Sequence, residues 1–311
     1  MIFLGFDTSN YTTSVAASCG DKEINIRKLL DVKTGERGLR QSDAVFQHMK
    51  QLPFLFSELT DNIDIKDVKA IGVSTRPRSI EGSYMPVFLQ GEGYAKVCAK
   101  SLDVPLYTYS HQDGHIMAGI KSAGCFDLLE KPFISVHLSG GTCEILKTEY
   151  NGKNFDVEII GGTKDISAGQ LIDRVGVKLG LAFPCGKEME KISKATDNFV
   201  KLPINAEEEY INFSGIETKA LSLVGKEKDD ELIRGLFIAI SKAIAKVLEN
   251  ASKKYKMNDV LLCGGVISNS IIKEYLQENL KLNINFASKE YSCDNACGIS
   301  ILTKMQYEKE G

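Results

Sequence analysis

A pattern of three short strand-like segments joined by tight turns occurs twice in the chain, and it constrains the fold more than any other feature. Turns rich in hydroxyl, amide or glycine residues separate the segments of each copy, as in β-hairpins. The second copy begins about 130 residues after the first. A duplication of this kind predicts two similar lobes, each opened by one three-stranded unit. The segments are 2–6, 12–17 and 23–30 in the first copy, and 133–138, 143–148 and 155–160 in the second.

Helical periodicity fills the spaces between these segments. The longest candidate helix, 231–251, carries an apolar residue every three or four positions. Shorter candidates are 44–59, 93–102 and 171–181, and Pro53 is expected to kink or break the first of them. No low-complexity linker divides the chain, so the alternation of strands and helices predicts an α/β protein whose two halves border a cleft.

Composition narrows the class of protein. The chain has 311 residues, of which 43% are hydrophobic and 25% charged, as in a soluble protein of two ordinary domains. A net charge of −3 gives no general attraction to nucleic acid, so an RNA partner would need a local basic patch. No apolar run approaches the roughly 20 residues of a membrane span, and the first residues do not resemble a secretory signal. Eight cysteines without a CxxC pair indicate reduced thiols, and we expect a cytoplasmic protein without membrane contact.

Two of the four histidines, His111 and His115, are four positions apart. On a helix such residues lie on one face, about 5–6 Å apart at Cβ. Two neutral imidazoles at that separation can bind one transition-metal ion, with a third ligand from elsewhere in the chain. The alternative is two surface histidines near a helix end, because this spacing alone is a weak signal.

Four turns have a chemistry suited to phosphate. Glycine lets backbone N–H groups approach an anion closely, and the acid and hydroxyls of the first turn could position a phosphate-bound cation such as Mg²⁺. Each turn alone is weak evidence, because glycine turns are common in β-hairpins. Two of the turns occupy matching positions in the duplicated units, which favours nucleotide binding. The turns are Asp7-Thr8-Ser9, Ser139-Gly140-Gly141-Thr142, Pro184-Cys185-Gly186 and Gly264-Gly265-Val266.

Taken in order, the motifs resemble those of the TsaD family of tRNA N6-adenosine threonylcarbamoyltransferases, formerly described as O-sialoglycoprotein endopeptidases. The resemblance covers nearly the whole chain. It implies the two-lobed actin-like ATPase fold, with duplicated mixed-sheet lobes of residues 1–120 and 121–289, an interlobe cleft, and residues 290–311 packed back onto the first lobe. The matching segments are 5–9, 38–53, 111–115, 138–142, 172–175 with 184–186, 213–216, 264–269 and 293–296.

The resemblance also implies a site. His111, His115 and Asp294 would be the catalytic residues and would hold one divalent metal, iron or zinc, leaving coordination positions open for substrate. An adenine nucleotide or acyl-adenylate would lie in the cleft. Asp173 and Asn269 have simpler alternatives, as a helix-surface acid and a helix N-cap. The expected substrate- or nucleotide-binding residues are Asp7, Ser9, Ser139, Gly140, Gly141, Asp173, Gly186, Gly264, Gly265 and Asn269.

The implied reaction transfers the threonylcarbamoyl group from threonylcarbamoyl-AMP to N6 of adenosine 37 in tRNAs that read codons beginning with A. The implied partners are tRNA and the accessory subunits of threonylcarbamoylation: an adenylate-forming enzyme, an actin-like paralogue and a small ATPase. For tRNA, the best candidate surface is the basic segment 27–40, extended by Arg76 and Arg78. A solvated loop of mixed charge is the alternative for that segment.

Several positions depart from the family pattern. Thr142 stands where the family has a histidine, Cys185 replaces a glycine, Glu217 a lysine and Asp113 a glutamate, while residues 76–83 replace a glycine-rich loop. These changes cluster on the expected substrate side. They leave two alternatives open: a divergent carbamoyl- or acyltransferase with another acceptor, and a nucleotide-binding regulatory protein.

Overall fold

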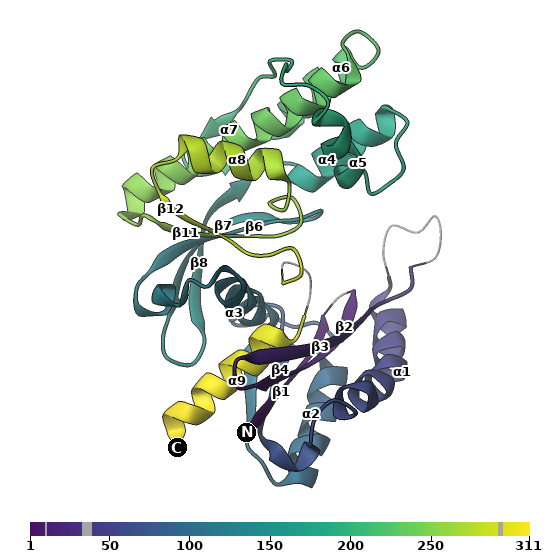
Figure 1. Cartoon of the computed structure of the whole chain (residues 1–311), viewed down its shortest axis with the longest axis vertical. Coiled ribbons are helices and arrows are strands. Elements are labelled where there is room, and N and C mark those ends of the chain that lie inside the picture. The colour runs from purple at the N-terminus through teal and green to yellow at the C-terminus, as the bar shows by residue number, and fades with distance from the viewer. Residues whose placement is uncertain (10, 33–38, 292–294) are drawn as a thin grey trace. The chain divides into compact units, whose positions relative to one another are not determined.

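The computed structural model describes residues 1–9, 11–32, 39–291 and 295–311. The chain divides into two compact units, each built on one β-sheet (Figure 1). Among the described residues, no helix has the length and apolar character needed to cross a membrane. Unit 1 comprises residues 1–126, 150–156 and 290–311, and unit 2 comprises residues 127–149 and 157–289.

The sheet of unit 1 has the strand order β3-β2-β1-β4-β5. Its first three strands form the antiparallel meander that the sequence predicts, and β4 and β5 extend it in parallel. The strand β1 runs through Ser9, so Asp7 pairs with Ser14 inside the ladder and the predicted turn at 7–9 is wrong. The strands are β1 (Ile2–Ser9), β2 (Thr12–Cys19), β3 (Lys22–Leu29), β4 (Val68–Arg76) and β5 (Leu106–Ser110).

Helices cover both faces of this sheet (Figure 1). Even-numbered residues of β1, such as Leu4 and Phe6, pack under α1 and α2, whereas Phe3 contacts Tyr307 of α9. The helix α1 continues through Pro53 without a break. The carbonyl of Met49, which loses its usual donor at that proline, accepts a hydrogen bond from the Tyr94 hydroxyl at 3.5 Å. The helices are α1 (Gln41–Thr60), α2 (Phe88–Leu102), α3 (His111–Ala123) and α9 (Cys297–Glu310), with a 3₁₀ turn at Ile65–Asp67.

The sheet of unit 2 has the strand order β12-β11-β6-β7-β8-β10-β9. The strands β6, β7 and β8 form the second copy of the duplicated pattern, and β6 pairs antiparallel with β7. On the other side, β11 is parallel to both β6 and β12, so this sheet is also mixed. The strands are β6 (Phe133–Leu138), β7 (Cys143–Tyr150), β8 (Phe155–Thr163), β9 (Ala206–Glu207), β10 (Tyr210–Ile211), β11 (Asp259–Cys263) and β12 (Asn283–Phe286).

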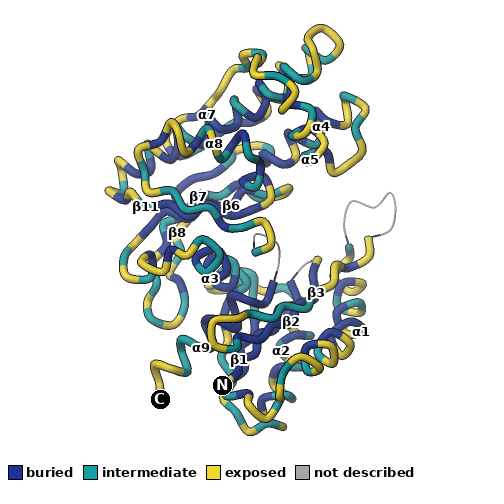
Figure 2. The backbone as a smooth tube through the Cα atoms, in the orientation of Figure 1, coloured by how far each residue is buried: buried dark blue, intermediate teal, exposed yellow. Residues whose placement is uncertain are grey.

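The core of unit 2 lies between one face of this sheet and its helices, where the tube of Figure 2 is mostly buried. The long helix α7 supplies the predicted apolar stripe, and its five residues Leu232, Leu236, Ile240, Ile244 and Val247 are all buried. The helices are α4 (Ala168–Lys178), α5 (Gly186–Ser193), α6 (Ser214–Leu223), α7 (Asp229–Tyr255) and α8 (Ser270–Asn279), with a 3₁₀ helix at Phe126–Glu130.

Candidate functional site

His111 and His115, both in unit 1, lie on successive turns at the start of α3, as their spacing predicts. The helix begins at His111, directly after β5, because Ser110 caps it and accepts a hydrogen bond from the Asp113 N–H. The rings of His111 and His115 have centroids 4.4 Å apart and an interplanar angle of 81°. The two imidazoles are therefore close enough to bind one metal ion.

A buried carboxylate holds the first of these rings. The Oδ2 atom of Asp7 lies 2.7 Å from Nδ1 of His111, and its Oδ1 atom accepts a hydrogen bond from the Ser9 N–H at 2.8 Å. Asp7 is 1% exposed, so its carboxylate is shielded from solvent and is held by these two contacts. The Ser9 hydroxyl is also buried, and it has no hydrogen-bond partner among the described residues.

This arrangement fits part of a metal centre. A carboxylate on Nδ1 orients a histidine so that Nε2 faces away from it, as is usual for metal ligands. Asp294, the expected third ligand, lies outside the described residues. Within the described part of the chain, no three side chains of His, Cys, Asp or Glu type form a group able to hold a metal. The described part of the chain thus supplies two neighbouring imidazoles, of which His111 is oriented by Asp7.

Asp113, expected to be a substrate-side change, is a structural residue instead. It is completely buried, and its Oδ2 atom accepts hydrogen bonds from the N–H and hydroxyl of Ser110 and from the Ser79 hydroxyl. Its Oδ1 atom accepts a bond from the Phe155 N–H at 3.0 Å. Asp113 therefore ties the start of α3 to two other segments of unit 1.

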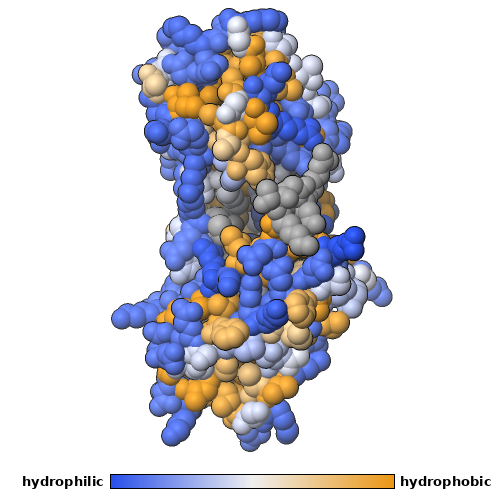
Figure 3. Space-filling model, turned by 90° about the vertical axis from the view of Figure 1, so that its right-hand side faces the viewer, coloured by the Kyte–Doolittle hydropathy of each residue, from blue (hydrophilic) through white to orange (hydrophobic). Residues whose placement is uncertain are grey.

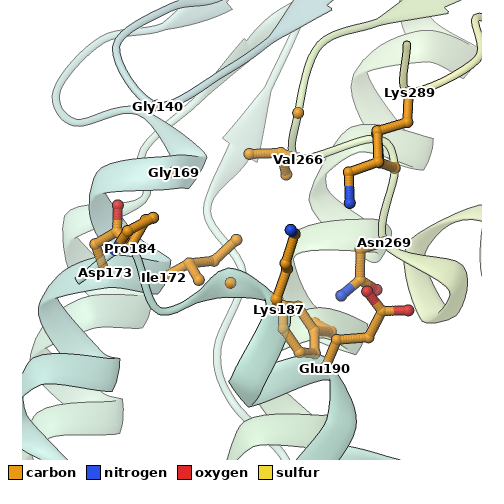
Figure 4. Close-up of a pocket in the computed structure, with 14 residues that line it drawn as sticks. Gly140, Gly169, Ile172, Asp173, Pro184, Lys187, Glu190, Val266, Asn269 and Lys289 are labelled. Atoms are coloured by element: carbon orange, nitrogen blue, oxygen red, sulfur yellow. The ribbon is translucent and has the colours of Figure 1, made fainter. Parts of the chain in front are cut away.

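Unit 2 contains a cavity of about 340 Å³ that gathers half of the predicted nucleotide-binding residues. This volume falls within the usual range for small-molecule sites. Its apolar lining includes Ile172, Pro184 and Val266, which Figure 4 labels. Phe237 also lines the cavity. The predicted residues that line it are Gly140, Asp173, Gly186, Gly265 and Asn269.

The start of α4 is fixed against the Ser139–Gly140 turn. The Ser167 hydroxyl donates to the Gly140 carbonyl at 2.6 Å, and a Cβ on Gly169 would lie 2.5 Å from the Gly140 Cα, so only glycine allows this approach. Asp173, farther along α4, accepts a hydrogen bond from the Cys185 N–H at 2.8 Å and thereby positions the start of α5. The cavity walls are thus built from local turn and cap geometry.

Three predicted residues shape the turns but do not line the cavity: Ser139, Gly141 and Gly264. The Ser139 hydroxyl accepts a hydrogen bond from the Thr142 N–H at 3.1 Å, which closes the turn. Asn269 is the helix N-cap that its simpler interpretation predicts. Its Oδ1 atom caps α8 by accepting from the Ile272 N–H, and the residue also lines the cavity.

Sequence reasoning did not assign a site role to several residues that line the cavity, among them Lys187, Glu190, Phe237, Ser268 and Lys289. Lys187 and Glu190 follow Gly186 by one and four positions on α5, a helical spacing that could have revealed them. Burial opposes ionisation of Glu190, but hydrogen bonds from Lys194 and Ser270 outweigh it and hold the pKa of this carboxyl below its usual value.

Two of the residues that depart from the family pattern have structural roles. Cys185 is fully buried, and burial, with a smaller effect of Asp173, raises the pKa of its thiol. This thiol therefore stays protonated and packs beside Gly176. Glu217 forms an ion pair with Arg174 at 3.3 Å on the surface of unit 2.

Solved structures share this fold at low sequence identity. HypF from T. kodakarensis has a TM-score of 0.63 at 14% identity, covering 100% of this chain and 48% of that one. An activator of 2-hydroxyisocaproyl-CoA dehydratase from Clostridium difficile has a TM-score of 0.56 at 15% identity, covering 100% and 97%. A ROK family glucokinase from Streptomyces griseus has a TM-score of 0.56 at 9% identity, covering 98% and 99%. These proteins have the actin-like ATPase fold, so the expected fold class is confirmed.

Sequence comparison identifies the family to which the chain belongs. The family model of TsaD, described as tRNA N6-adenosine threonylcarbamoyltransferase, matches residues 26–301. A protein of that name from Thermosipho africanus is 30% identical over 99% of this chain and 95% of its own length. Another from Fervidobacterium nodosum is 31% identical, covering 96% of this chain and 91% of its own length. The chain therefore belongs to the TsaD family of tRNA N6-adenosine threonylcarbamoyltransferases, as its ordered motifs predict.

Proposed function

We propose that this protein transfers the threonylcarbamoyl group from threonylcarbamoyl-AMP to N6 of adenosine 37 in tRNAs that read codons beginning with A. The observation that carries the proposal is the family match over residues 26–301. The paired imidazoles of unit 1 and the cavity of unit 2 support it, because the reaction needs a group that activates the acyl donor and a pocket for its adenylate part.

In this proposal, His111, His115 and Asp294 hold one divalent iron or zinc ion. When bound, such an ion acts as a Lewis acid on the carbonyl or carboxylate oxygen of the acyl group. Asp7 keeps the His111 ring oriented through the 2.7 Å contact to Nδ1. These residues position the donor, and the tRNA supplies the attacking amine.

The adenylate part of the donor would lie in the unit 2 cavity. The apolar wall of Ile172, Phe237 and Val266 suits a purine ring, and the glycine turns allow phosphate to approach the backbone. Asp173 uses Oδ1 for the Cys185 N–H, and we propose that its other oxygen accepts from ribose hydroxyls. Asn269, whose Oδ1 atom caps α8, would use its amide nitrogen as a donor to the nucleotide.

Complementation tests this function directly. The chain is expressed in cells depleted of their own transferase, and the modified nucleoside is measured in purified tRNA. We expect the wild-type chain to restore the modification, and His115→Ala to fail. Lys121→Ala, on the same helix and paired with Glu23, serves as the matched control. Lack of restoration by a folded wild-type chain would contradict the proposal.

Metal analysis tests the ligands independently of activity. We expect the purified wild-type protein to bind one iron or zinc ion, and His111→Ala, His115→Ala and Asp294→Ala each to lose most of it. Full occupancy in all three variants would remove these residues as ligands. Because this readout needs no tRNA, it separates an error in the metal site from an error in the substrate.

For tRNA, we propose the basic surface of unit 1 that includes Arg27, Arg40, Arg76 and Arg78. The guanidinium of Arg27 donates to the Glu290 carbonyl at 3.1 Å, and that of Arg76 bonds Thr75 and Ser79. Residues 33–38 of the predicted surface lie outside the described part. Arg40→Glu should weaken tRNA binding and lower its dependence on salt, whereas unchanged binding would exclude this surface.

We also propose that the accessory subunits bind unit 1 through α1 and α2. Both helices expose large apolar side chains, with Phe54 at 77%, Val97 at 67% and Phe46 at 52% exposure. Figure 3, which views the face carrying α1, shows hydrophobic residues interspersed among hydrophilic ones there. Co-purification with an actin-like paralogue should be lost in Phe54→Glu and retained in Glu58→Gln. Equal retention would place the contact elsewhere. Modification of tRNA together with these subunits is consistent with the cytoplasmic location that we expect.

One observation favours a second function, an acyltransferase with another acceptor. Where the family has a glycine-rich loop, side-chain hydrogen bonds hold residues 76–83: Ser79 bonds Asp113, and the Ser83 hydroxyl accepts from the Arg78 N–H. Such a loop offers less freedom for a large acceptor. This alternative predicts binding of the acyl-adenylate without binding of tRNA, which a filter-binding assay distinguishes.

A further inference from the structure

Two lysines line the unit 2 cavity from different elements. Lys187 is the second residue of α5, and Lys289 follows the end of β12 by three positions. Figure 4 shows both side chains extending into the cavity, with their ammonium groups pointing towards the same space near Val266 and Asn269. Residues 102 positions apart in the chain thus bring two positive charges to one place.

The carboxylates at this cavity have partners of their own. Glu190 forms an ion pair with Lys194 at 2.9 Å and accepts hydrogen bonds from the N–H and hydroxyl of Ser270. Asp173 accepts from the Cys185 N–H. Among the described residues, no carboxylate oxygen lies within 4.0 Å of the Lys187 ammonium group. The positive charge of Lys187 is therefore left for a ligand.

Two further groups beside these lysines can donate to a ligand. Ser268 lines the cavity, and its hydroxyl oxygen is buried without a hydrogen-bond partner in the described part of the chain. A buried hydroxyl without a partner is costly, so a polar ligand close to this residue would be favoured. The helix α5 begins at Gly186 without a side-chain cap, so the first-turn N–H groups and the helix dipole also favour an anion.

We propose that Lys187, Lys289 and Ser268 form a subsite for the 5′-phosphate groups of the bound nucleotide. The inference rests on the nucleotide site of the proposed function and extends it to residues outside the glycine turns. A site with two ammonium groups is suited to more than one negative charge, so affinity should rise from adenosine to AMP to ADP. The same subsite would receive the phosphate of an acyl-adenylate.

Calorimetric titration of the full chain with adenosine, AMP and ADP, without divalent metal, tests the subsite. We expect Lys187→Met and Lys289→Met each to lower ADP affinity about tenfold, the usual effect of losing one charge-assisted hydrogen bond. Adenosine affinity should stay within about twofold of wild type. The control is Lys191→Met, whose side chain is 79% exposed on the same helix and pairs with Glu188. It should bind all three ligands as the wild type does.

The outcomes separate the subsite from the site that contains it. If both lysine variants bind ADP as the wild type does, or lose adenosine and ADP affinity in parallel, the subsite is overturned and the nucleotide site stands. If the wild-type chain binds none of the three compounds, both the nucleotide site and the subsite are refuted. Ser268→Ala, which removes only the hydroxyl, should lower ADP affinity by a smaller factor than either lysine change.

Discussion

The Asp7 carboxylate lies 2.7 Å from Nδ1 of His111, although 104 positions separate the two residues in the chain. Asp7 lies on β1, the central strand of the unit 1 sheet. His111 is the first residue of α3, the helix that follows the edge strand β5. Since the carboxylate is buried, it fixes which ring nitrogen is left for a metal. The sheet scaffold therefore determines the orientation of a proposed metal ligand.

Asp7→Asn should weaken metal binding without unfolding the protein. The amide is nearly isosteric but carries no charge, so it orients His111 less well and lowers its basicity. Loss of such outer-shell partners usually costs 10–100-fold in metal affinity. Competition with a chromogenic chelator measures the affinity for zinc. Asp61→Asn, at an exposed helix end, is the matched control. Unchanged affinity in Asp7→Asn, with loss in His111→Ala, would contradict this role.

Asp113→Ala should destabilise unit 1 strongly. The substitution leaves the Ser110 and Phe155 N–H groups and the Ser79 hydroxyl without their acceptor, and it removes the capping box of α3. Buried donors without partners and a lost cap together cost about 3 kcal/mol or more. Thermal unfolding followed by circular dichroism measures the effect. The exposed Asp61→Ala should stay within about 0.5 kcal/mol of wild type. A similarly small effect of Asp113→Ala would show that Asp113 is not structural.

Local patterns predicted much of the fold and part of the site. The pairing of His111 and His115 follows from helical spacing alone, and the turns around Gly140 and Gly265 follow from glycine placement beside strands. Contacts between distant segments could not be predicted in this way. The Asp7–His111 contact and the convergence of Lys187 and Lys289 depend on the tertiary fold, which no local period encodes.

Two local rules gave expectations that differ from the structure: a possible break of α1 at Pro53 and a turn at residues 7–9. Proline usually breaks or kinks a helix, but α1 continues through Pro53, and the Tyr94 hydroxyl of α2 makes a long 3.5 Å contact with the Met49 carbonyl that the proline leaves without its usual donor. Hydroxyl-rich sequence usually marks a turn, yet Thr8 is in β1, where its hydroxyl donates to the Val87 carbonyl and accepts from the Gly91 N–H. The buried hydrogen bonds of Thr8 link β1 to residues about 80 positions away, which a local rule does not include.

Gly264→Ala should destabilise unit 2, whereas Gly265→Ala should be tolerated. Gly264 has φ of 108°, and a Cβ there would collide with the Leu138 carbonyl. A strained backbone of this kind costs about 1–3 kcal/mol for a residue with a side chain. A Cβ on Gly265 would meet no atom within 4 Å. Urea unfolding of both variants measures the difference. Equal stability of the two would contradict this account of the turn.

Unfolding free energy should fall as the pH is lowered from about 6.5 to 4, and His48 should account for part of that fall. This histidine is fully buried on α1, and Nδ1 lies 2.8 Å from the Thr13 hydroxyl. Burial lowers the pKa of His48 from 6.5 to about 4, outweighing the nearby Asp7 carboxylate and the Ser9 carbonyl, which raise it. The neutral ring is therefore the form that the folded state accommodates.

The sign follows from proton uptake. Between these two pKa values the unfolded chain binds a proton at His48 and the folded chain does not, so acid favours unfolding by about 1.4 kcal/mol per pH unit. The stabilisation is complete above pH 6.5 and is lost progressively as the pH falls to about 4, a total of about 3 kcal/mol. His48→Gln cannot take up this proton, so its free energy of unfolding should fall less over the same range. Lys50→Gln, on the exposed face of the same helix, should keep the wild-type dependence. Parallel curves for the wild type and His48→Gln, from urea unfolding at each pH, would show that His48 does not control the acid sensitivity.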